Sequence, residues 1–175
     1  DLIIKNAKVY DGSGGPWYFS DIAVKDGIIA GTGKINDSRG KRCIDGEGRA
    51  AAPGFVDPHT HSDCNCATVP DADAKIVQGV TTEVTGNCGL SLTPVSKERV
   101  GLLRDYLKPF IPGPAMPDFQ WSHAGELMDI VDRNGYTNDL AFLSGHGTVR
   151  IAVMGFDDRE PSPTELEKMK KLFAR

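Results

Sequence analysis

The stretch that decides the fold is Pro53-Gly54-Phe55-Val56-Asp57-Pro58-His59-Thr60-His61. Proline and glycine separate it from the chain before it, and Phe55-Val56-Asp57 predicts a short buried strand. Residues 80–85 and 139–144 are apolar or β-branched runs that predict two more strands. Helical patterns occur over residues 72–79, 96–110, 122–133 and 163–175. This alternation predicts an α/β fold with a parallel sheet, whose short apolar strands are covered on both faces.

The connections of such a sheet leave two main architectures, a doubly wound sheet or the start of a (β/α)8 barrel. The sequence has neither a G-x-G-x-x-G motif after the first strand nor a P-loop, which disfavours nucleotide-binding versions. A complete barrel needs about 250 residues, roughly twice the length of residues 53–175. We therefore expect residues 53–175 to form the first three βα units of an incomplete (β/α)8 barrel, the N-terminal part of a longer enzyme.

Residues 1–52 predict a different kind of structure. Short β-type runs follow one another, and Asp26-Gly27 is a strong hairpin signal between residues 21–25 and 28–30. These runs predict a small antiparallel sheet. We expect a small β-sandwich-like domain over residues 1–52.

The composition excludes several classes of protein. Hydrophobic residues make up 39% of the chain and charged residues 25%, as in soluble globular proteins rather than disordered ones. No apolar run approaches the ~18 residues that span a bilayer, and the net charge of -4 disfavours a nucleic-acid surface. No secretory signal is visible at the N-terminus, and four cysteines among 175 residues do not make a disulfide scaffold. We expect a reducing, cytoplasmic location, where cysteine serves packing or metal binding.

The pair His59 and His61 is the sharpest chemical feature. In extended backbone, residues two apart project to the same side, so two imidazoles at this spacing can hold one metal ion. They come just after the first strand of the predicted barrel, at the end where barrel enzymes place catalytic groups. The H-x-H pattern alone is a weak signal that two hydrogen-bonded loop histidines would also satisfy, but the preceding Pro53-Gly54-Phe55-Val56-Asp57 favours a metal site.

Cys88 follows the second predicted strand, within Thr85-Gly86-Asn87-Cys88-Gly89. Glycines on both sides let backbone and thiolate approach a ligand closely. A thiolate favours Zn²⁺ over magnesium or calcium. A lone free cysteine is more often a small buried hydrophobe, but adjacency to the histidine pair in a parallel barrel reverses that expectation.

His146 and Asp63 are further candidates for a role in substrate binding or in supporting the metal ligands. His146 lies in Gly145-His146-Gly147, at the end of the third predicted strand and at the same rim of the barrel. It can bind substrate, stabilise an oxyanion or hydrogen-bond a loop. Asp63 comes two residues after the histidine pair and can orient an imidazole, contact substrate or be an ordinary loop aspartate.

For four other residues we expect structural roles rather than catalytic or metal-binding ones. We expect His123 to be structural or solvent-facing at a helix start and Asp57 to stabilise the end of its strand. Cys64 and Cys66 offer a rival zinc cluster with the histidines. That alternative is disfavoured because structural zinc clips use a C-x₂₋₄-C spacing, not C-x-C.

These motifs together resemble the amidohydrolase superfamily, through Pro53–Asp57 leading to His59-Thr60-His61. Within it, the stretches Gly79-Val80-Thr81-Thr82 and Gly86-Asn87-Cys88-Gly89 are similar to the N-acyl-D-amino-acid deacylases, or D-aminoacylases. The stretches Gly145–Arg150 and Pro163–Met169 resemble that family too. The H-x-H element is shared by many amidohydrolases, whereas G-N-C-G is much more specific.

The resemblance implies a distorted barrel with a small β-domain, and a Zn²⁺ cofactor with Cys88 as ligand and His59 and His61 at the adjacent metal position. It implies hydrolysis of the amide bond of an N-acyl-D-amino acid, a small-molecule substrate, while the net charge and hydropathy already disfavour nucleic acid and membrane as partners. The family's further histidine ligands and its general-base aspartate lie on later strands, for which residues 1–175 have no matching positions. We therefore expect the remainder of the barrel as a partner and doubt the activity of this chain alone.

Two alternatives stay open. One is another amidohydrolase activity, such as that of a dihydroorotase or hydantoinase, which typically uses a carboxylated lysine; Cys88 argues against it. The other is a catalytically incomplete barrel fragment that binds metal without catalysing a reaction.

Overall fold

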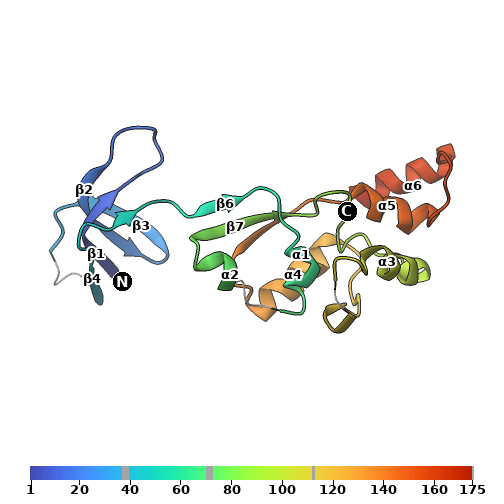
Figure 1. The fold of residues 1–175 in the computed structure, drawn as a ribbon, viewed down its shortest axis with the longest axis horizontal. Helices are drawn as coiled ribbons and strands as arrows, with labels where there is room; N and C mark the ends of the chain where they lie inside the picture. Colours follow the sequence, from blue (N-terminus) through green and yellow to red (C-terminus); the bar gives the residue numbers. More distant parts are fainter. Residues whose placement is uncertain (37–39, 70–72, 112, 175) are drawn as a thin grey trace. The chain divides into compact units, whose positions relative to one another are not determined.

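The computed structural model describes residues 1–36, 40–69, 73–111 and 113–174. They divide into two compact units, Asp1–Pro53 and Gly54–Arg175 (Figure 1). The first is built from β-strands, and the second combines parallel strands with helices. No helix among these residues is long and apolar enough to cross a bilayer.

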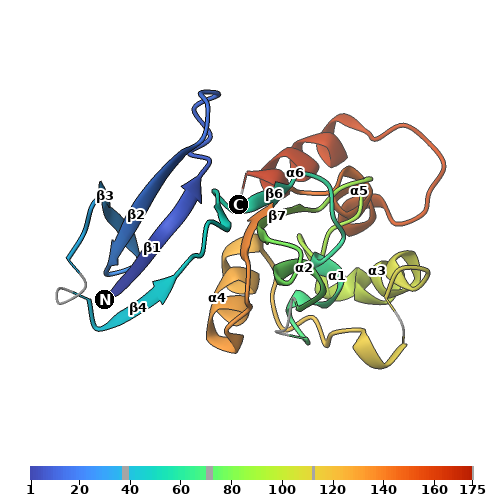
Figure 2. The same cartoon turned by 60° about the vertical axis from the view of Figure 1, so that its left-hand side comes forward.

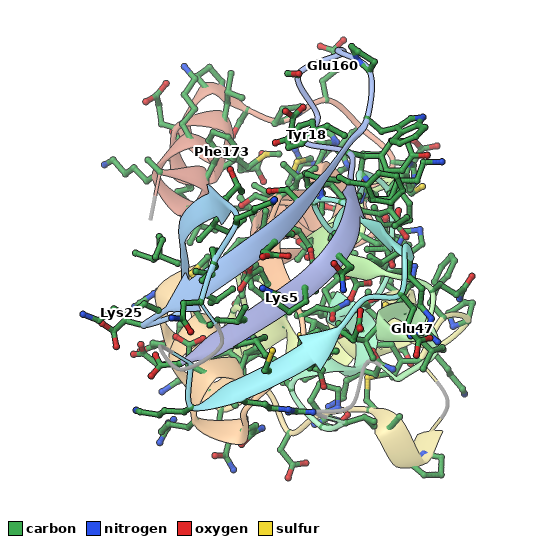
Figure 3. The ribbon with its side chains drawn as sticks, turned by 90° about the vertical axis from the view of Figure 1, so that its left-hand side faces the viewer. Lys5, Tyr18, Lys25, Glu47, Glu160 and Phe173 are labelled. Carbon is green, nitrogen blue, oxygen red and sulfur yellow. The ribbon has the colours of Figure 1, made fainter. Side chains whose placement is uncertain are left out.

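The first unit is one five-stranded sheet. Its strands are β1 (Leu2–Val9), β2 (Tyr18–Lys25), β3 (Ile28–Gly33), β4 (Arg42–Asp45) and β5 (Ala50–Ala51). The order is β3-β2-β1-β4, with β5 also pairing with β1. Figure 2 shows β1 between β2 and β4, and Figure 3 faces the sheet, with Lys5 on β1 and Tyr18 and Lys25 at the two ends of β2.

The pairing of this sheet is mixed. The expected antiparallel arrangement holds for β1, β2 and β3, and the predicted Asp26-Gly27 hairpin joins β2 to β3. In contrast, β4 and β5 run parallel to β1, because the chain crosses from β3 at one edge to β4 at the other. Within the described part of this unit there is one sheet and no second β-layer of the kind that the sandwich-like expectation requires.

A bulge bends β1 between Ile4 and Ala7. Asn6 adopts a left-handed conformation, with φ of 53°. Its N–H donates to Asp21 Oδ1 at 3.0 Å instead of joining the ladder. The segments on either side of this bulge, Leu2–Ile4 and Ala7–Val9, therefore form one continuous strand, whose buried side chains include Ala7 and Val9.

The second unit contains a three-stranded parallel sheet in the order β6-β7-β8. The strands are β6 (Phe55–Asp57), β7 (Val80–Thr85) and β8 (Asp139–Phe142). The helices are α1 (Asp63–Cys66), α2 (Asp73–Ile76), α3 (Val100–Leu107), α4 (Ala124–Asn134), α5 (His146–Met154) and α6 (Pro163–Phe173), with 3-10 turns η2 (Lys97–Arg99) and η3 (Gly113–Ala115). Figures 1 and 2 both show α5 and α6 side by side. The predicted parallel α/β arrangement is confirmed.

One face of this sheet is covered by helices. Glu83 pairs with Leu140 and Thr85 with Phe142, so the side chains of each pair share a face. Leu140 and Phe142 pack on the main hydrophobic core, which includes residues of α3 and α4. On the other face Val56 of β6 remains 59% exposed.

Local sequence signals determine two of the helix starts. Ser162 caps α6, and Glu165 returns the hydrogen bond, so a reciprocal capping box spans the first turn, with Pro163 at its first helical position. His123 caps α4 by accepting a hydrogen bond from the N–H of Glu126, which confirms its structural role.

Helix α5 differs from the sequence expectation, which placed a strand end at Gly145-His146-Gly147. These residues instead open the helix His146–Met154. The first turn packs so tightly that a Cβ on Gly147 would lie 2.2 Å from Tyr106 Oη. The glycines therefore serve close packing rather than a flexible loop.

A candidate metal centre

The two ligand-bearing turns lie at the same edge of the sheet. The first carries His59 and His61 and follows β6, and the second carries Cys88 and follows β7. Because β6 and β7 are parallel neighbours, their carboxyl ends coincide. The N–H of Thr60 also donates to Val84 O at 3.1 Å, which draws the first turn onto the end of β7.

His59, His61 and Cys88 converge. His59 Nε2 lies 3.2 Å from Cys88 Sγ, and one ligand atom from each of the three residues lies within 4.8 Å of the other two. Tetrahedral zinc with its usual nitrogen and sulfur bond lengths would hold such a pair about 3.6 Å apart. The histidine rings stand nearly perpendicular, at 77°, with centroids 5.8 Å apart. Within the described ranges, no other three His, Cys, Asp or Glu side chains form such a group.

The donor set fits a zinc ion. Two imidazole nitrogens and a thiolate are ligands that zinc prefers. His61 Nδ1 is buried and has no hydrogen-bond partner among the described residues, so the chain leaves this nitrogen unsatisfied. His59 and Cys88 are exposed, and His61 is half-buried beside Phe110, with ring centroids 6.0 Å apart. The cluster is therefore open on one side.

The conformation of the second turn depends on glycine. Gly86 has φ of 79°, and a Cβ built on it would lie 1.9 Å from Leu143 O. Cys88 itself adopts φ of 56°, which is uncommon for a residue with a side chain. This left-handed backbone turns the chain sharply after β7 and brings the sulfur to His59.

Asp57 supports the first turn, as the sequence predicts. Its Oδ1 accepts the N–H of His59 at 3.1 Å, and its other oxygen accepts from Lys75 Nζ. The bond from Lys75 is the main reason why the pKa of Asp57 is lowered. This carboxylate therefore fixes the backbone immediately before the ligand pair.

Asp63 is buried rather than available to substrate. It is 1% exposed, and its Oδ1 is buried with no hydrogen-bond partner among the described residues. Burial raises its pKa to about 6, against the lowering effect of nearby backbone N–H groups, that of Gly86 first. This burial disfavours substrate contact, and the role of Asp63 beside the histidine pair stays a prediction.

His146 lies near the rim but outside the three-residue group. It is exposed at the start of α5 and lines a hollow of about 260 Å³ together with Met169 and Phe173. Thr148, two residues on, donates its N–H to Gly89 O at 3.2 Å, so this end of α5 borders the cysteine turn. The expected rim position is present, and a role of its imidazole stays a prediction.

The rival cluster of Cys64 and Cys66 with the histidines is wrong for this structure. Both side chains are buried in the main hydrophobic core, and Cys66 is 0% exposed. Burial raises the pKa of each thiol to about 12, which keeps it protonated. All four cysteines, including exposed Cys43 and Cys88, are free thiols.

Two residues near the centre escaped the sequence analysis. Asn87 donates from Nδ2 to Thr60 O at 3.2 Å and to Val84 O at 2.8 Å. Glu83, in strand β7, is a charged residue whose side chain is 0% exposed. A glutamate inside the β-branched run Val80–Thr85 is a sequence signal that could have identified Glu83 as a candidate, whereas the partners of Asn87 are visible only in three dimensions.

Comparisons with known proteins agree with this geometry. Residues 42–174 match the model of the amidohydrolase family. The chain belongs to the amidohydrolase family. Its relatives include N-acyl-D-aspartate deacylase of Alcaligenes xylosoxydans xylosoxydans, 36% identical over 99% of this chain and 34% of the relative.

Two solved structures have the same fold over this chain. One is D-aminoacylase, studied for its binuclear metal centre, with a TM-score of 0.83, 33% identity, and coverage of 99% of this chain and 35% of that one. The other is N-acyl-D-glutamate deacylase from Bordetella bronchiseptica complexed with zinc and a phosphonate inhibitor, with a TM-score of 0.82, 29% identity, and coverage of 98% and 35%. The chain spans about a third of the length of these relatives. The predicted resemblance and fold class are confirmed.

Proposed function

We propose that this chain is part of a zinc-dependent hydrolase that cleaves the amide bond of N-acyl-D-amino acids. The observation that carries the proposal is the convergence of His59, His61 and Cys88 beyond the ends of β6 and β7. It is supported by relatives named as deacylases of N-acyl-D-aspartate and N-acyl-D-glutamate, the second in complex with zinc. Residues 53–175 would supply the first three βα units of the barrel.

In this proposal the chain's own residues hold the metal. His59 and His61 would each offer a neutral imidazole nitrogen, and Cys88 a thiolate. A bound zinc ion supplies Lewis acidity, which activates water at neutral pH and polarises a carbonyl group. The thiolate must stay reduced, and Cys88 is exposed, so we place the protein in the reducing cytoplasm.

The net reaction adds water across the amide. Oxygen from water joins the carbonyl carbon, the carbon–nitrogen bond breaks, and a proton is delivered to the leaving nitrogen, giving a carboxylate and a D-amino acid. A carboxylate near the metal would move that proton. Asp63 is unsuited because its side chain is buried, only 1% exposed. We therefore propose that the general base and further ligands come from the part of the barrel that relatives have beyond the matched third.

Zinc content and hydrolysis of the purified full-length protein test this proposal together. We expect bound zinc and release of D-amino acids from N-acetyl-D-amino acids, with N-acetyl-L-amino acids and cyclic amides as comparison substrates. Cys88→Ser should lose tight zinc binding and nearly all turnover. Cys43→Ser, which changes an exposed thiol on β4, should keep both.

The outcomes separate the candidate functions. Zinc binding without hydrolysis of any of these amides would favour the incomplete, metal-binding alternative. Full activity with zinc retained in Cys88→Ser would refute the assignment of the thiolate. Preferential hydrolysis of cyclic amides would favour a hydantoinase-like or dihydroorotase-like activity.

A further inference from the structure

The side-chain amide of Asn87 contacts both ligand-bearing turns. Its Nδ2 donates to Thr60 O at 3.2 Å and to Val84 O at 2.8 Å. Thr60 is the residue between His59 and His61, and Asn87 immediately precedes Cys88. One half-buried amide therefore joins the backbone between the two imidazoles to the backbone that carries the thiol.

Thr60 is held at each of its polar groups. Its N–H donates to Val84 O at 3.1 Å, its carbonyl accepts from Asn87, and its hydroxyl lies 2.9 Å from Ser62 Oγ. Thr60 is buried, so these groups have little access to water. Since the peptide planes on either side of Thr60 set the directions of the two imidazoles, fixing this residue fixes both ligands.

The second turn depends on the same contacts. Val84 O accepts from Thr60 and from Asn87, so the end of β7 anchors both turns. The left-handed conformation of Cys88, with φ of 56°, would relax toward a commoner one if the preceding residue were released. Loss of the Asn87 amide would thus loosen the thiolate and the imidazole pair together.

We infer that Asn87 is a positioning residue that holds the two imidazoles and the thiolate in a metal-binding arrangement before the ion arrives. The inference rests on the proposed function, because it assumes that His59, His61 and Cys88 bind zinc. Residues that hydrogen-bond around metal ligands typically change metal affinity or activity by about 10–100-fold when mutated. We expect Asn87→Ala to weaken zinc binding by about that factor.

The chain offers a matched control. Asn134 at the end of α4 also donates its side-chain amide to a backbone carbonyl, that of Ala67, at 2.9 Å. Asn134→Ala removes a bond of the same kind from a residue outside the ligand-bearing turns. A purely structural contribution of an asparagine amide should therefore appear equally in both variants.

Three measurements on the full-length protein test the inference. Zinc affinity is obtained by competition with a chromophoric chelator, the cobalt-substituted protein gives an absorption spectrum that reports ligand geometry, and steady-state kinetics give kcat and KM. Asn87→Ala should bind zinc about 10–100-fold more weakly and show an altered cobalt spectrum, with kcat falling more than KM changes. Asn134→Ala should match the parent protein in all three.

The results distinguish this inference from the proposed function. If the parent protein binds no zinc, the proposed function fails and the inference falls with it. If the parent binds zinc and Cys88→Ser loses it, but Asn87→Ala keeps its affinity within twofold and its cobalt spectrum unchanged, only the positioning role is overturned. Should Asn87→Ala not fold, Asn87→Ser removes the same long-reaching amide with less change in polarity and is judged by the same criteria.

Discussion

Replacement of Glu83 should reveal how much a buried carboxylate contributes to this fold. Glu83 is 0% exposed and accepts hydrogen bonds from Tyr136 Oη at 3.2 Å, from Asn138 Nδ2 at 3.1 Å and from Ser62 Oγ. Lys75 Nζ lies 3.9 Å from the same carboxylate. This group thus joins β7 to the turn after β6 and to the segment before β8, through partners that otherwise face a low-dielectric interior.

The size of the effect follows from these partners. Burial, then the charge of Glu83, raises the pKa of Tyr136 to about 12, so Tyr136 remains a donor across the physiological range. In Glu83→Gln one oxygen can still accept, but an amide N–H₂ replaces the second oxygen and faces Ser62 and Lys75. Weakening of charge-assisted hydrogen bonds worth about 1.5–3 kcal/mol each predicts a loss of about 2–4 kcal/mol. Glu83→Ala, which leaves every partner uncompensated, should cost about 3–5 kcal/mol.

Urea unfolding measures this loss. Trp121 is buried in the same unit and reports on it, and a Trp17→Phe background removes the other tryptophan, which is 46% exposed. With a slope of about 1–3 kcal/mol/M, a loss of about 2–4 kcal/mol should lower the Glu83→Gln midpoint by about 0.7–4 M. Glu98→Gln is the matched control, because Glu98 also accepts from a serine hydroxyl but at the surface, and should change stability by about 0.5 kcal/mol or less. A Glu83→Gln midpoint equal to that of the control would refute the reasoning.

Two further predictions concern other parts of the chain. Gly86→Ala should destabilise the protein by about 3 kcal/mol or more, or prevent folding, because its Cβ would lie 1.9 Å from Leu143 O. A Cβ on Gly101 in α3 meets nothing within 4 Å, so Gly101→Ala should stabilise the protein by up to about 1 kcal/mol. Thermal unfolding of the two variants compares these effects. In the first unit, hydrogen bonds from the Ile35 N–H, the Lys5 ammonium and a further backbone N–H lower the pKa of Asp21 to about 2. The stabilising contribution of Asp21 is therefore complete above about pH 4 and lost as pH falls through about 2. Amide hydrogen exchange in β1 should rise over that window in the parent protein and less steeply in Asp21→Asn. Parallel exchange–pH profiles for the two proteins would contradict this prediction.

The amino-acid sequence by itself determined the strands of the second unit and the place of the candidate metal ligands. Short apolar or β-branched runs specify β6, β7 and β8, and parallel strands must present their carboxyl ends at one edge. The approach of His59, His61 and Cys88 follows from that rule once each is seen to come after a strand. The start of α6 is likewise local, since Ser162 and Glu165 cap each other.

Other features depended on the tertiary structure. Helix α5 has a glycine on each side of His146, and both are required by close packing: Gly145 lies against the backbone of Gly89 and Leu90, and Gly147 against Tyr106. The parallel direction of β4 and β5 depends on which edge of the sheet the chain reaches. Both are decided by contacts between residues distant in sequence, on which local conformational preference has little influence.

The roles of Asp63, Glu83 and Asn87 show the same division. Sequence patterns can place a carboxylate or an amide near a strand end, but burial and hydrogen-bond partners decide whether it faces substrate, a backbone N–H or another side chain. Glu83 accepts from Asn138, and Asn87 donates to Thr60, across 55 and 27 positions of the chain. Periodicity along the chain predicts which face a side chain takes, whereas the partner across the interface is decided only when the elements pack.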